Sequence, residues 1–323
     1  MGTYVRTQTI DHAIGELGSV SLSVTSGDVR ARAIAGGDAH VRATFEIRAT
    51  SDAEADRIFD AIQLLVRRSE GQLTVEERDG GVSLGSVIGR IFGGSGHADL
   101  SVEAEIPAAA SVHLTAISSG MEVNGFHGEQ QYRTVSGDVM LAQLGGSVRL
   151  ETVSGDATIH ADEPVALQVQ GVSGDVTITT PLLRGLRANT VSGDVELEAE
   201  LAGDGDFRVE TVSGDLVVGL LGSATFEVHG LSTDVNSELD HRLEGQVDRR
   251  RLIIGSGAPR LIFNSMSGDV DVRRPRRISG PVRSEKPTAA PPAEKESQLD
   301  VLRALERGEI TVDEATRRLA QGS

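Results

Sequence analysis

The stretch TVSGDVMLAQLGGSVRLETVSGDATI, residues 134–159, decides the fold because it contains one short pattern twice. The centre of the pattern is the tripeptide Ser-Gly-Asp, which occurs seven times in the chain. The glycines of the seven copies are Gly27, Gly137, Gly155, Gly174, Gly193, Gly214 and Gly268. From Gly137 to Gly214 the copies are 18, 19, 19 and 21 residues apart. A regular period of this length indicates a repeat architecture, with one structural unit per period.

The residues around each tripeptide alternate between apolar and polar types. The positions two before, two after and four after the glycine are nearly always apolar, as Val172, Val176 and Ile178 are around Gly174. This period of two predicts β-strands with one buried face. We therefore expect the valines two before the glycine to form one buried column. They are Val135, Val153, Val172, Val191 and Val212.

The tripeptide itself has the chemistry of a tight turn. Glycine adopts positive φ without a Cβ penalty, and Ser and Asp side chains accept hydrogen bonds from nearby backbone N–H groups. We therefore interpret these residues as structural turn residues. The set is Gly137, Asp138, Gly155, Asp156, Gly174, Asp175, Gly193, Asp194, Gly214 and Asp215.

Two all-β architectures fit two strands per period of about 19 residues. In a parallel β-helix, or β-solenoid, each period is one rung, and like corners stack about 4.8 Å apart. In an antiparallel meander the tripeptide would return at every second hairpin, but such hairpins favour Asn-Gly or Asp-Gly at their tips. Here the glycine precedes the aspartate, and near-identical periods favour stacking of like side chains. We predict a solenoid of Ser-Gly-Asp repeats over residues 117–273.

The region before the repeats, residues 1–116, predicts a β-sheet with one capping helix at 52–68. Ser51 and Glu54 form a capping box, and the apolar residues from Ile58 to Val66 lie at helical spacing. An exposed terminal rung is a template for edge pairing, so a solenoid needs a cap of this kind. We expect the helix to cover a sheet made by residues 3–50 and 72–106.

After the repeats, the composition changes twice. Residues 274–293, RPRRISGPVRSEKPTAAPPA, predict a disordered basic linker. Residues 294–323 predict a small helical hairpin, with a second capping box at Thr311 and Glu314. Helices this short need a partner surface for their apolar faces. We expect the solenoid of the same chain, self-association with another copy, or a different protein partner to engage the apolar tail residues, namely Leu299, Leu302, Leu305, Ile310 and Leu319.

Composition restricts the functional classes. The 323 residues carry a net charge of −17, although residues 273–293 hold six basic side chains against one acidic one. The acidic body should repel nucleic acid and anionic membranes. The chain has no Cys, which fits a reducing compartment. We find no export signal and no segment near 20 apolar residues, so we expect a cytoplasmic protein without an integral membrane segment.

The repeated T-V-S-G-D-V pattern resembles a known family. It is similar to the bacterial β-strand-repeat proteins known as "putative adhesins", whose domain has no known function, over roughly residues 20–273. The tail LDVLRALERGEITVDEATRRLAQ resembles short helical hairpins appended to bacterial proteins, including some of this family, which are thought to mediate oligomerisation or attachment. The resemblance implies a β-solenoid and, in some relatives, a link to envelope stress. It implies no catalytic residues.

The sequence contains no motif of an enzyme or a cofactor site. The eight histidines have no metal-ligand spacing, and neither a phosphate-binding loop nor a nucleophile elbow is present. With two Tyr and no Trp, a polysaccharide-acting enzyme is disfavoured. Cations could bridge a column of stacked aspartates, but calcium prefers six to eight oxygens and one Asp per rung supplies too few. We expect a non-enzymatic scaffold or interaction module without cofactors; the alternative is a sensor of envelope stress or of cationic ligands.

Overall fold

The computed structural model describes residues 2–77, 98–246 and 249–276. They belong to one compact unit, residues 1–276, and residues 277–323 form a second unit. The predicted tail hairpin and nearly all of the predicted linker lie outside the described residues. The described part is almost all β-structure and has one helix, α1 (Asp52–Ile62).

The strands alternate buried and exposed residues, as the period of two predicts. In the first half of the chain they are β1 (Gly2–Ala13), β2 (Ser19–Ser26), β3 (Asp28–Ile34), β4 (Asp38–Ala49), β5 (Leu65–Ser69), β6 (Gln72–Glu76), β7 (Ala98–Pro107), β8 (Ser111–Ser118), β9 (Met121–Asn124), β10 (Glu129–Ser136) and β11 (Val139–Ser154). In the second half they are β12 (Ala157–Gln170), β13 (Val176–Asn189), β14 (Val195–Leu201), β15 (Phe207–Glu210), β16 (Leu216–Leu221), β17 (Ala224–Ser232), β18 (Val235–Ser237), β19 (His241–Gln246), β20 (Arg249–Ile254), β21 (Arg260–Ser267) and β22 (Val270–Arg273).

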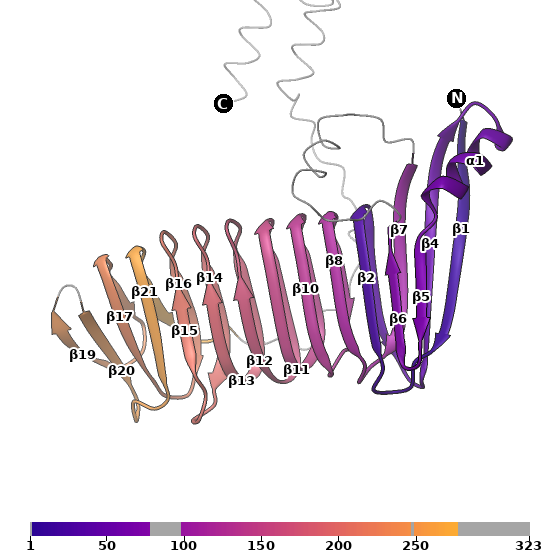
Figure 1. Cartoon of the computed structure of the whole chain (residues 1–323). Helices are drawn as coiled ribbons and strands as arrows, with labels where there is room; N and C mark the ends of the chain where they lie inside the picture. Colours follow the sequence, from indigo (N-terminus) through magenta and orange to yellow (C-terminus); the bar gives the residue numbers. More distant parts are fainter. Residues whose placement is uncertain (1, 78–97, 247–248, 277–323) are drawn as a thin grey trace, which may run out of the picture. The chain divides into compact units, whose positions relative to one another are not determined.

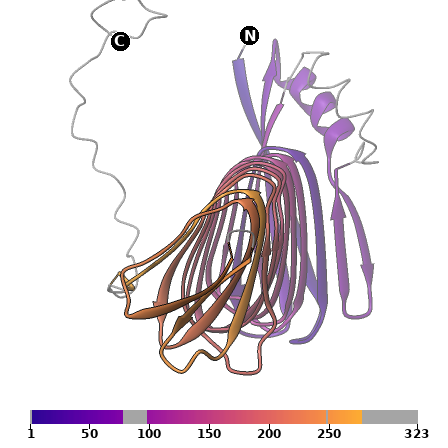
Figure 2. The same ribbon diagram turned by 90° about the vertical axis from the view of Figure 1, so that its left-hand side faces the viewer.

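Consecutive repeats pair in parallel, which a solenoid requires and an antiparallel meander does not allow. For example, β10 pairs with β8 and β11, and β12 pairs with β11 and β13, all in parallel register. The strands join in one sheet that wraps into two facing layers, seen end-on as nested ovals in Figure 2. Along the stack they form the row of near-parallel strands in Figure 1. We call the segments that lead into each Ser-Gly-Asp corner the first layer and the segments that follow it the second layer, so that β11, β12 and β13 each begin in the second layer and end in the first.

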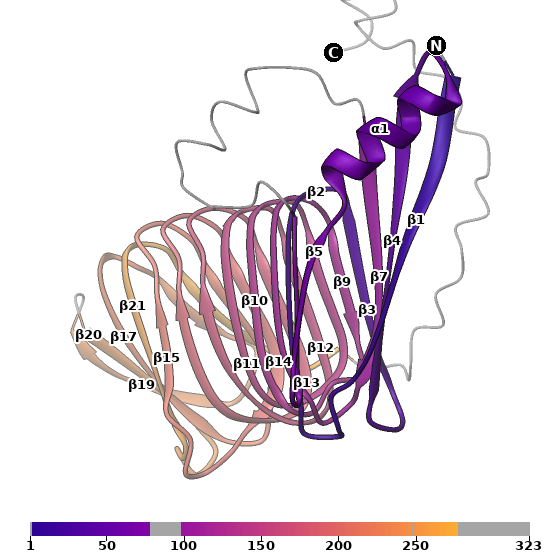
Figure 3. The ribbon, with the colours of Figure 1, turned by 45° about the vertical axis from the view of Figure 1, so that its right-hand side comes forward.

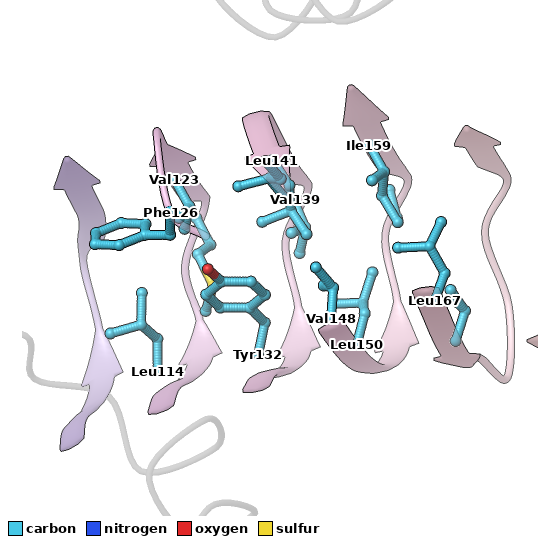
Figure 4. Packing of buried hydrophobic residues seen from close by; sticks show 14 of the residues in the cluster. Leu114, Val123, Phe126, Tyr132, Val139, Leu141, Val148, Leu150, Ile159 and Leu167 are labelled. Atoms are coloured by element: carbon cyan, nitrogen blue, oxygen red, sulfur yellow. The ribbon is translucent and has the colours of Figure 1, made fainter. Parts of the chain in front are cut away.

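The core is a set of aliphatic columns between the two layers. In the second layer the positions two and four after each glycine stack in register and are buried, as Val139, Ala157, Val176 and Val195 are. Figure 4 shows Val139, Leu141 and Ile159 of the second layer together with Leu114, Leu150 and Leu167 of the first layer, all of them buried. Filling the core mainly with aliphatic residues agrees with the low aromatic content of the sequence.

The C-terminal end of the stack departs from chain order. The rung made by β21 and β22 lies between the rung of β15 and β16 and the rung of β17 and β18. The outermost rung, made by β17 and β18, therefore comes earlier in the sequence than the rung of β21 and β22 on which it stacks. The strands β19 and β20 form an antiparallel hairpin that pairs with β17 and covers the end of the first layer.

The N-terminal end is extended by antiparallel strands and covered by α1. Outside β2 and β3 lie β6 and β7, and then β4 and β1 continue the second layer in antiparallel register. The helix packs on β1 and β4, as Figure 3 shows. Arg6 of β1 bonds to Asp52 and Asp56 of the helix, and the ring of Phe59 meets that of Phe45 edge-on at 5.3 Å.

The predicted helix boundary at residue 68 was wrong. The Ser51 hydroxyl caps the N-terminus by accepting the Glu54 N–H at 3.2 Å, as the capping box predicts. The helix ends at Ile62, however, and Leu65–Ser69 form β5, which pairs with β6. The hydrogen bond from Leu64 N to the Gln8 side chain at 2.9 Å ties this segment to β1. A tertiary strand partner thus prevails over helical spacing.

No separate unit ends near residue 116. The strand β8 crosses the expected boundary between residues 116 and 117, and β2 and β3 form a rung of the same stack, with their own Ser-Gly-Asp corner at Gly27. Across residues 2–77, 98–246 and 249–276, no helix has the length and apolar character needed to cross a lipid bilayer.

Candidate functional site: the Ser-Gly-Asp corner

The corner glycines satisfy two requirements at once. From Gly137 to Gly214 their φ angles lie between 112° and 153°, where residues with a Cβ are strained. Each also stacks closely on the rung before it, so that a Cβ on Gly174 would overlap the carbonyl oxygen of Gly155. Both the turn and the rung spacing therefore require glycine, which has no Cβ.

The corner aspartates form a continuous ladder of hydrogen bonds between rungs. The Oδ1 atom of Asp138 accepts the backbone N–H of Asp156 at 3.0 Å, and Asp156 accepts that of Asp175 at 2.9 Å. The same bond recurs at each further rung, so that seven aspartates stand in one row. We call this the acidic row: Asp138, Asp156, Asp175, Asp194, Asp215, Asp269 and Asp234.

The backbone reinforces this ladder. The carbonyl of Asp175 accepts the N–H of Ala157 at 2.9 Å, and the serine N–H groups bond to the preceding rung, as Ser173 N does to Val153 O at 3.0 Å. The sequence predicted that aspartate would bond to the turn amides. It did not reveal that each carboxylate reaches the N–H of the next aspartate, which sits in the next rung. The near-constant spacing of the tripeptides is the signal that could have shown it.

The acidic row concentrates negative charge at the surface. Neighbouring carboxylates one rung apart repel by about 1 kcal/mol in water, and each hydrogen bond of the ladder contributes about as much in the other direction. At the C-terminal end, Asp234 pairs with Arg250 at 3.2 Å. At the other end the row stops because Gly120 occupies the position opposite Asp28. The hydrogen bonds of the ladder thus offset the repulsion between neighbouring carboxylates.

The valines before each glycine do not form a buried column, so that prediction was wrong. Val153, Val172, Val191 and Val212 are 45–48% exposed, and Val135 is half-buried. They stack in register with Met266 and Leu231, which are more exposed still. We call these seven residues the apolar row: Val135, Val153, Val172, Val191, Val212, Met266 and Leu231.

A shift in alternation at the glycine explains this difference. Thr134 and Val139 are both buried although they are five residues apart, an odd number. The same holds for Thr152 and Ala157. The corner therefore moves the inward face by one position, and the valine two before the glycine points outward. Spacing alone could not show this, because period-2 alternation assumes an unbroken strand.

The two rows run side by side along the same edge of the solenoid, and together we call them the corner ridge. In each of its seven rungs the residue of the apolar row precedes the aspartate by three positions. At the C-terminal end the ridge borders a hollow of about 600 Å³, lined by Asp194, Asp215, Asp234 and Asp269 with Leu231 and Arg250. The ridge thus offers carboxylates and aliphatic groups in parallel lines.

The remaining expected features fall into three groups. The tail residues Leu299, Leu302, Leu305, Ile310 and Leu319 lie outside the described residues, and so does most of the linker. Of the linker, Arg276 bonds to Glu196 at 3.2 Å. Within the described ranges, no three His, Asp or Glu side chains gather closely enough to hold a metal ion.

Solved structures match this chain only at low sequence identity and low TM-score. Solved structures that resemble it include a "putative cell adhesion protein" from Clostridium sporogenes (11% identity, TM-score 0.26, covering 84% of this chain and 100% of that one). Others are a "putative lipid binding protein" from Parabacteroides distasonis (12%, 0.41, 82% and 96%) and a "putative adhesin" from Bacteroides fragilis (13%, 0.32, 83% and 97%). These low values give no basis for transferring a function. No curated protein matches.

The family assignment comes from a family model that covers the whole solenoid. The model of the Toastrack domain DUF4097, a domain of unknown function, matches residues 15–183 and again 166–273. These two matches together span every Ser-Gly-Asp corner of the chain. The chain therefore belongs to the Toastrack DUF4097 family.

Proposed function

We propose that this chain is a non-enzymatic scaffold that binds a protein partner through the corner ridge. The observation that carries the proposal is the apolar row, which is held exposed on a regular support. Aliphatic side chains exposed together on a soluble surface commonly mark an interaction site. The support is rigid because every rung fixes the next through backbone hydrogen bonds and the acidic row.

The acidic row gives such a surface selectivity. Charges beside an apolar contact fix the register of a partner and exclude partners of like charge. A partner with aliphatic side chains flanked by basic ones fits both rows. An anionic lipid surface or a nucleic acid would meet the acidic row with like charge.

Photocrosslinking in the producing cell tests the proposal. A photoreactive residue replaces Val191 on the ridge or Thr158, an exposed residue of β12 on the second layer. We expect the Val191 position to give an adduct with another polypeptide and the Thr158 position to give none. Equal adducts at both positions, or none heavier than the chain itself, would contradict the proposal.

Binding of a cationic ligand is a second candidate, favoured by the four aspartates around the terminal hollow. The envelope-stress role suggested by the family resemblance has no support in the fold.

Calorimetric titration with an oligolysine peptide tests the cationic candidate, with the triple variant Asp194→Asn, Asp215→Asn, Asp269→Asn as control. We expect the variant to bind at least ten-fold more weakly if the acidic row is the site, and binding in both should weaken with added salt. Equal binding by the two would exclude the row.

A further inference from the structure

The free edge of β1 is a surface that the corner ridge does not include. Within residues 2–77, 98–246 and 249–276, β1 pairs with β4 on one side and with no strand on the other. It lies at the N-terminal end of the stack, as Figure 1 shows. The backbone N–H and C=O groups of every second residue therefore point away from the sheet without a strand partner. Such an edge can accept a further strand.

The other free edges of the described solenoid are short or charged. The edge strand β18 has three residues. The edge strand β5 has five residues, with Arg67 and Arg68 exposed, and β19 has six, with Arg242 and Glu244 exposed. Short length and charged side chains are the usual means by which proteins prevent unwanted strand pairing. These three edges are therefore protected.

The strand β1 has none of these protections. It pairs with β4 over all twelve of its residues without a bulge, and it contains neither Lys nor Pro. Most side chains on its exposed face are β-branched, namely Thr3, Val5, Thr7 and Thr9. Such side chains pack well against those of a neighbouring strand. The edge is therefore long, regular and suited to a further strand.

The charge at this edge allows a second copy of the acidic chain to approach. The strands β1 and β4 carry three Arg against three Asp and Glu, so their charges sum to zero. On α1, which packs on both strands, Asp52 and Asp56 are paired with Arg6. Two copies of a chain with net charge −17 repel each other, and the repulsion is weakest where the local charge is close to zero.

An antiparallel pair of β1 strands is self-complementary in one register, with Thr7 opposite Thr7 of the second copy. The facing residues are then Thr3 and Asp11, Tyr4 and Ile10, Val5 and Thr9, and Arg6 and Gln8. No pair has like charges, and both members of each pair lie on the same face of the sheet, as the alternation requires. A shift of the register by one position along the pair would set Arg6 opposite Arg6 in one direction and Val5 opposite Asp11 in the other.

We propose that two copies of this chain join through their β1 strands as an antiparallel pair, which continues the second layer of one solenoid into that of the other. The register pairs residues 2–12 and forms about ten backbone hydrogen bonds, a number typical of a whole protein interface. Because both copies use the same edge, the contact closes as a two-fold dimer. The corner ridge takes no part in this contact, so the inference is independent of the proposed function.

Disulfide formation tests the register, because the natural chain has no cysteine. In the full-length variant Thr7→Cys the two cysteines face each other, and opposite Cα atoms of an antiparallel pair lie about 4.5–5.5 Å apart, within the range of a disulfide. In the control Val5→Cys the two cysteines are four residues out of register, or more than about 13 Å apart. We expect mild oxidation to give at least ten-fold more covalent dimer in the first variant. Equal yields, or no covalent dimer of Thr7→Cys, would overturn the inference.

Charge exchange at two facing positions tests the same contact without a crosslink. Val5 and Thr9 face each other twice in the dimer, and both side chains are exposed. The variant Val5→Lys, Thr9→Lys sets like charges opposite each other, whereas the matched control Val5→Lys, Thr9→Glu sets opposite charges there.

We expect sedimentation equilibrium of the full-length natural chain to show a dimer. Its dissociation constant should rise at least ten-fold in the variant with two lysines and return to within about three-fold of the natural value in the control. A natural chain that is a monomer, or two variants that behave alike, would contradict pairing through β1. In that case crosslinking from Val191 still tests the proposed function by itself.

Discussion

At the scale of single residues, a corner position requires glycine for two reasons, namely the positive φ and the close contact with the preceding rung. Comparing two glycines of the chain separates these two effects. Gly174 has φ 112° and lies against the carbonyl of Gly155, whereas Gly36 has φ 103° and open space, with no atom within 4 Å of where a Cβ would lie. The backbone conformation is nearly the same at both, and the available space is not. The pair therefore measures how much of the glycine requirement comes from stacking.

We predict that Gly174→Ala destabilises the protein far more than Gly36→Ala. Positive φ alone costs about 1–3 kcal/mol for a residue with a Cβ, and Gly174→Ala adds a clash with backbone that cannot move without shifting a rung. Asp175→Asn should change stability by less than about 1 kcal/mol, because the amide oxygen still accepts the N–H of Asp194 and one charge is removed. Denaturant unfolding of the three variants checks the order. Equal losses for the two glycine variants would show that stacking is unimportant.

Among the residues that the structure describes, Tyr132 is the largest fully buried side chain, and its hydroxyl donates to Gln130 Oε1 at 3.1 Å. Burial raises the pKa of Tyr132 far above its usual value of about 10. Above pH 10 the unfolded chain releases this proton and the folded chain keeps it, so stability must fall as pH rises. We predict that Tyr132→Phe reduces this loss. Unfolding measured between pH 8 and 11 checks it, and an unchanged slope would contradict it.

At the scale of elements, the alternation of buried and exposed positions shifts by one residue at each corner, between the strand that enters it and the strand that leaves it. Val195 is 2% exposed and Val191 is 48% exposed, although four residues separate them. We predict that Val195→Asp prevents stable folding, because it buries an unpaired charge. Val191→Asp should cost little, in contrast to what the sequence pattern alone indicates. Thermal unfolding of both variants distinguishes the two, and a severe effect at Val191 would contradict the exposed position.

Pattern and chemistry predicted the element types better than their limits or faces. The parallel strands follow from alternation and from the regular glycines, since both are local properties of the chain. The exposed face of Val191 depends on how the corner turns, and the end of the helix at Ile62 depends on the pairing of β5 with β6. These outcomes are set by contacts between distant residues. The same reason explains the partial prediction of the acidic row. The sequence indicated that its aspartates are turn residues, but not that each one bonds to the aspartate of the next rung.

At the scale of the molecule, the order of rungs at the C-terminal end is a property that no local pattern contains. Ser232 and Ser267 align across adjacent rungs, as do Ser213 and Ser267, which places β21 between β15 and β17. The segment that is later in sequence therefore lies between two earlier ones. During folding the rung of β17 and β18 cannot take its final position until residues 260–273 are in place.

We predict that residues 260–273 hold the C-terminal end together. A chain that ends at Gly257 lacks the parallel partners of β17 and β18, and it leaves β15 and β16 exposed. A chain that ends at Arg276 is the control, because it keeps every rung. Hydrogen exchange should show that amides of β17 and β20 in the shorter chain lose the protection that they have in the control, while those of β10 to β13 keep theirs. The rungs contact only their neighbours, so the loss should stay local. Full protection of β17 in the shorter chain would mean that the outer rung can pair directly with β15 and β16, and that the inserted rung is dispensable.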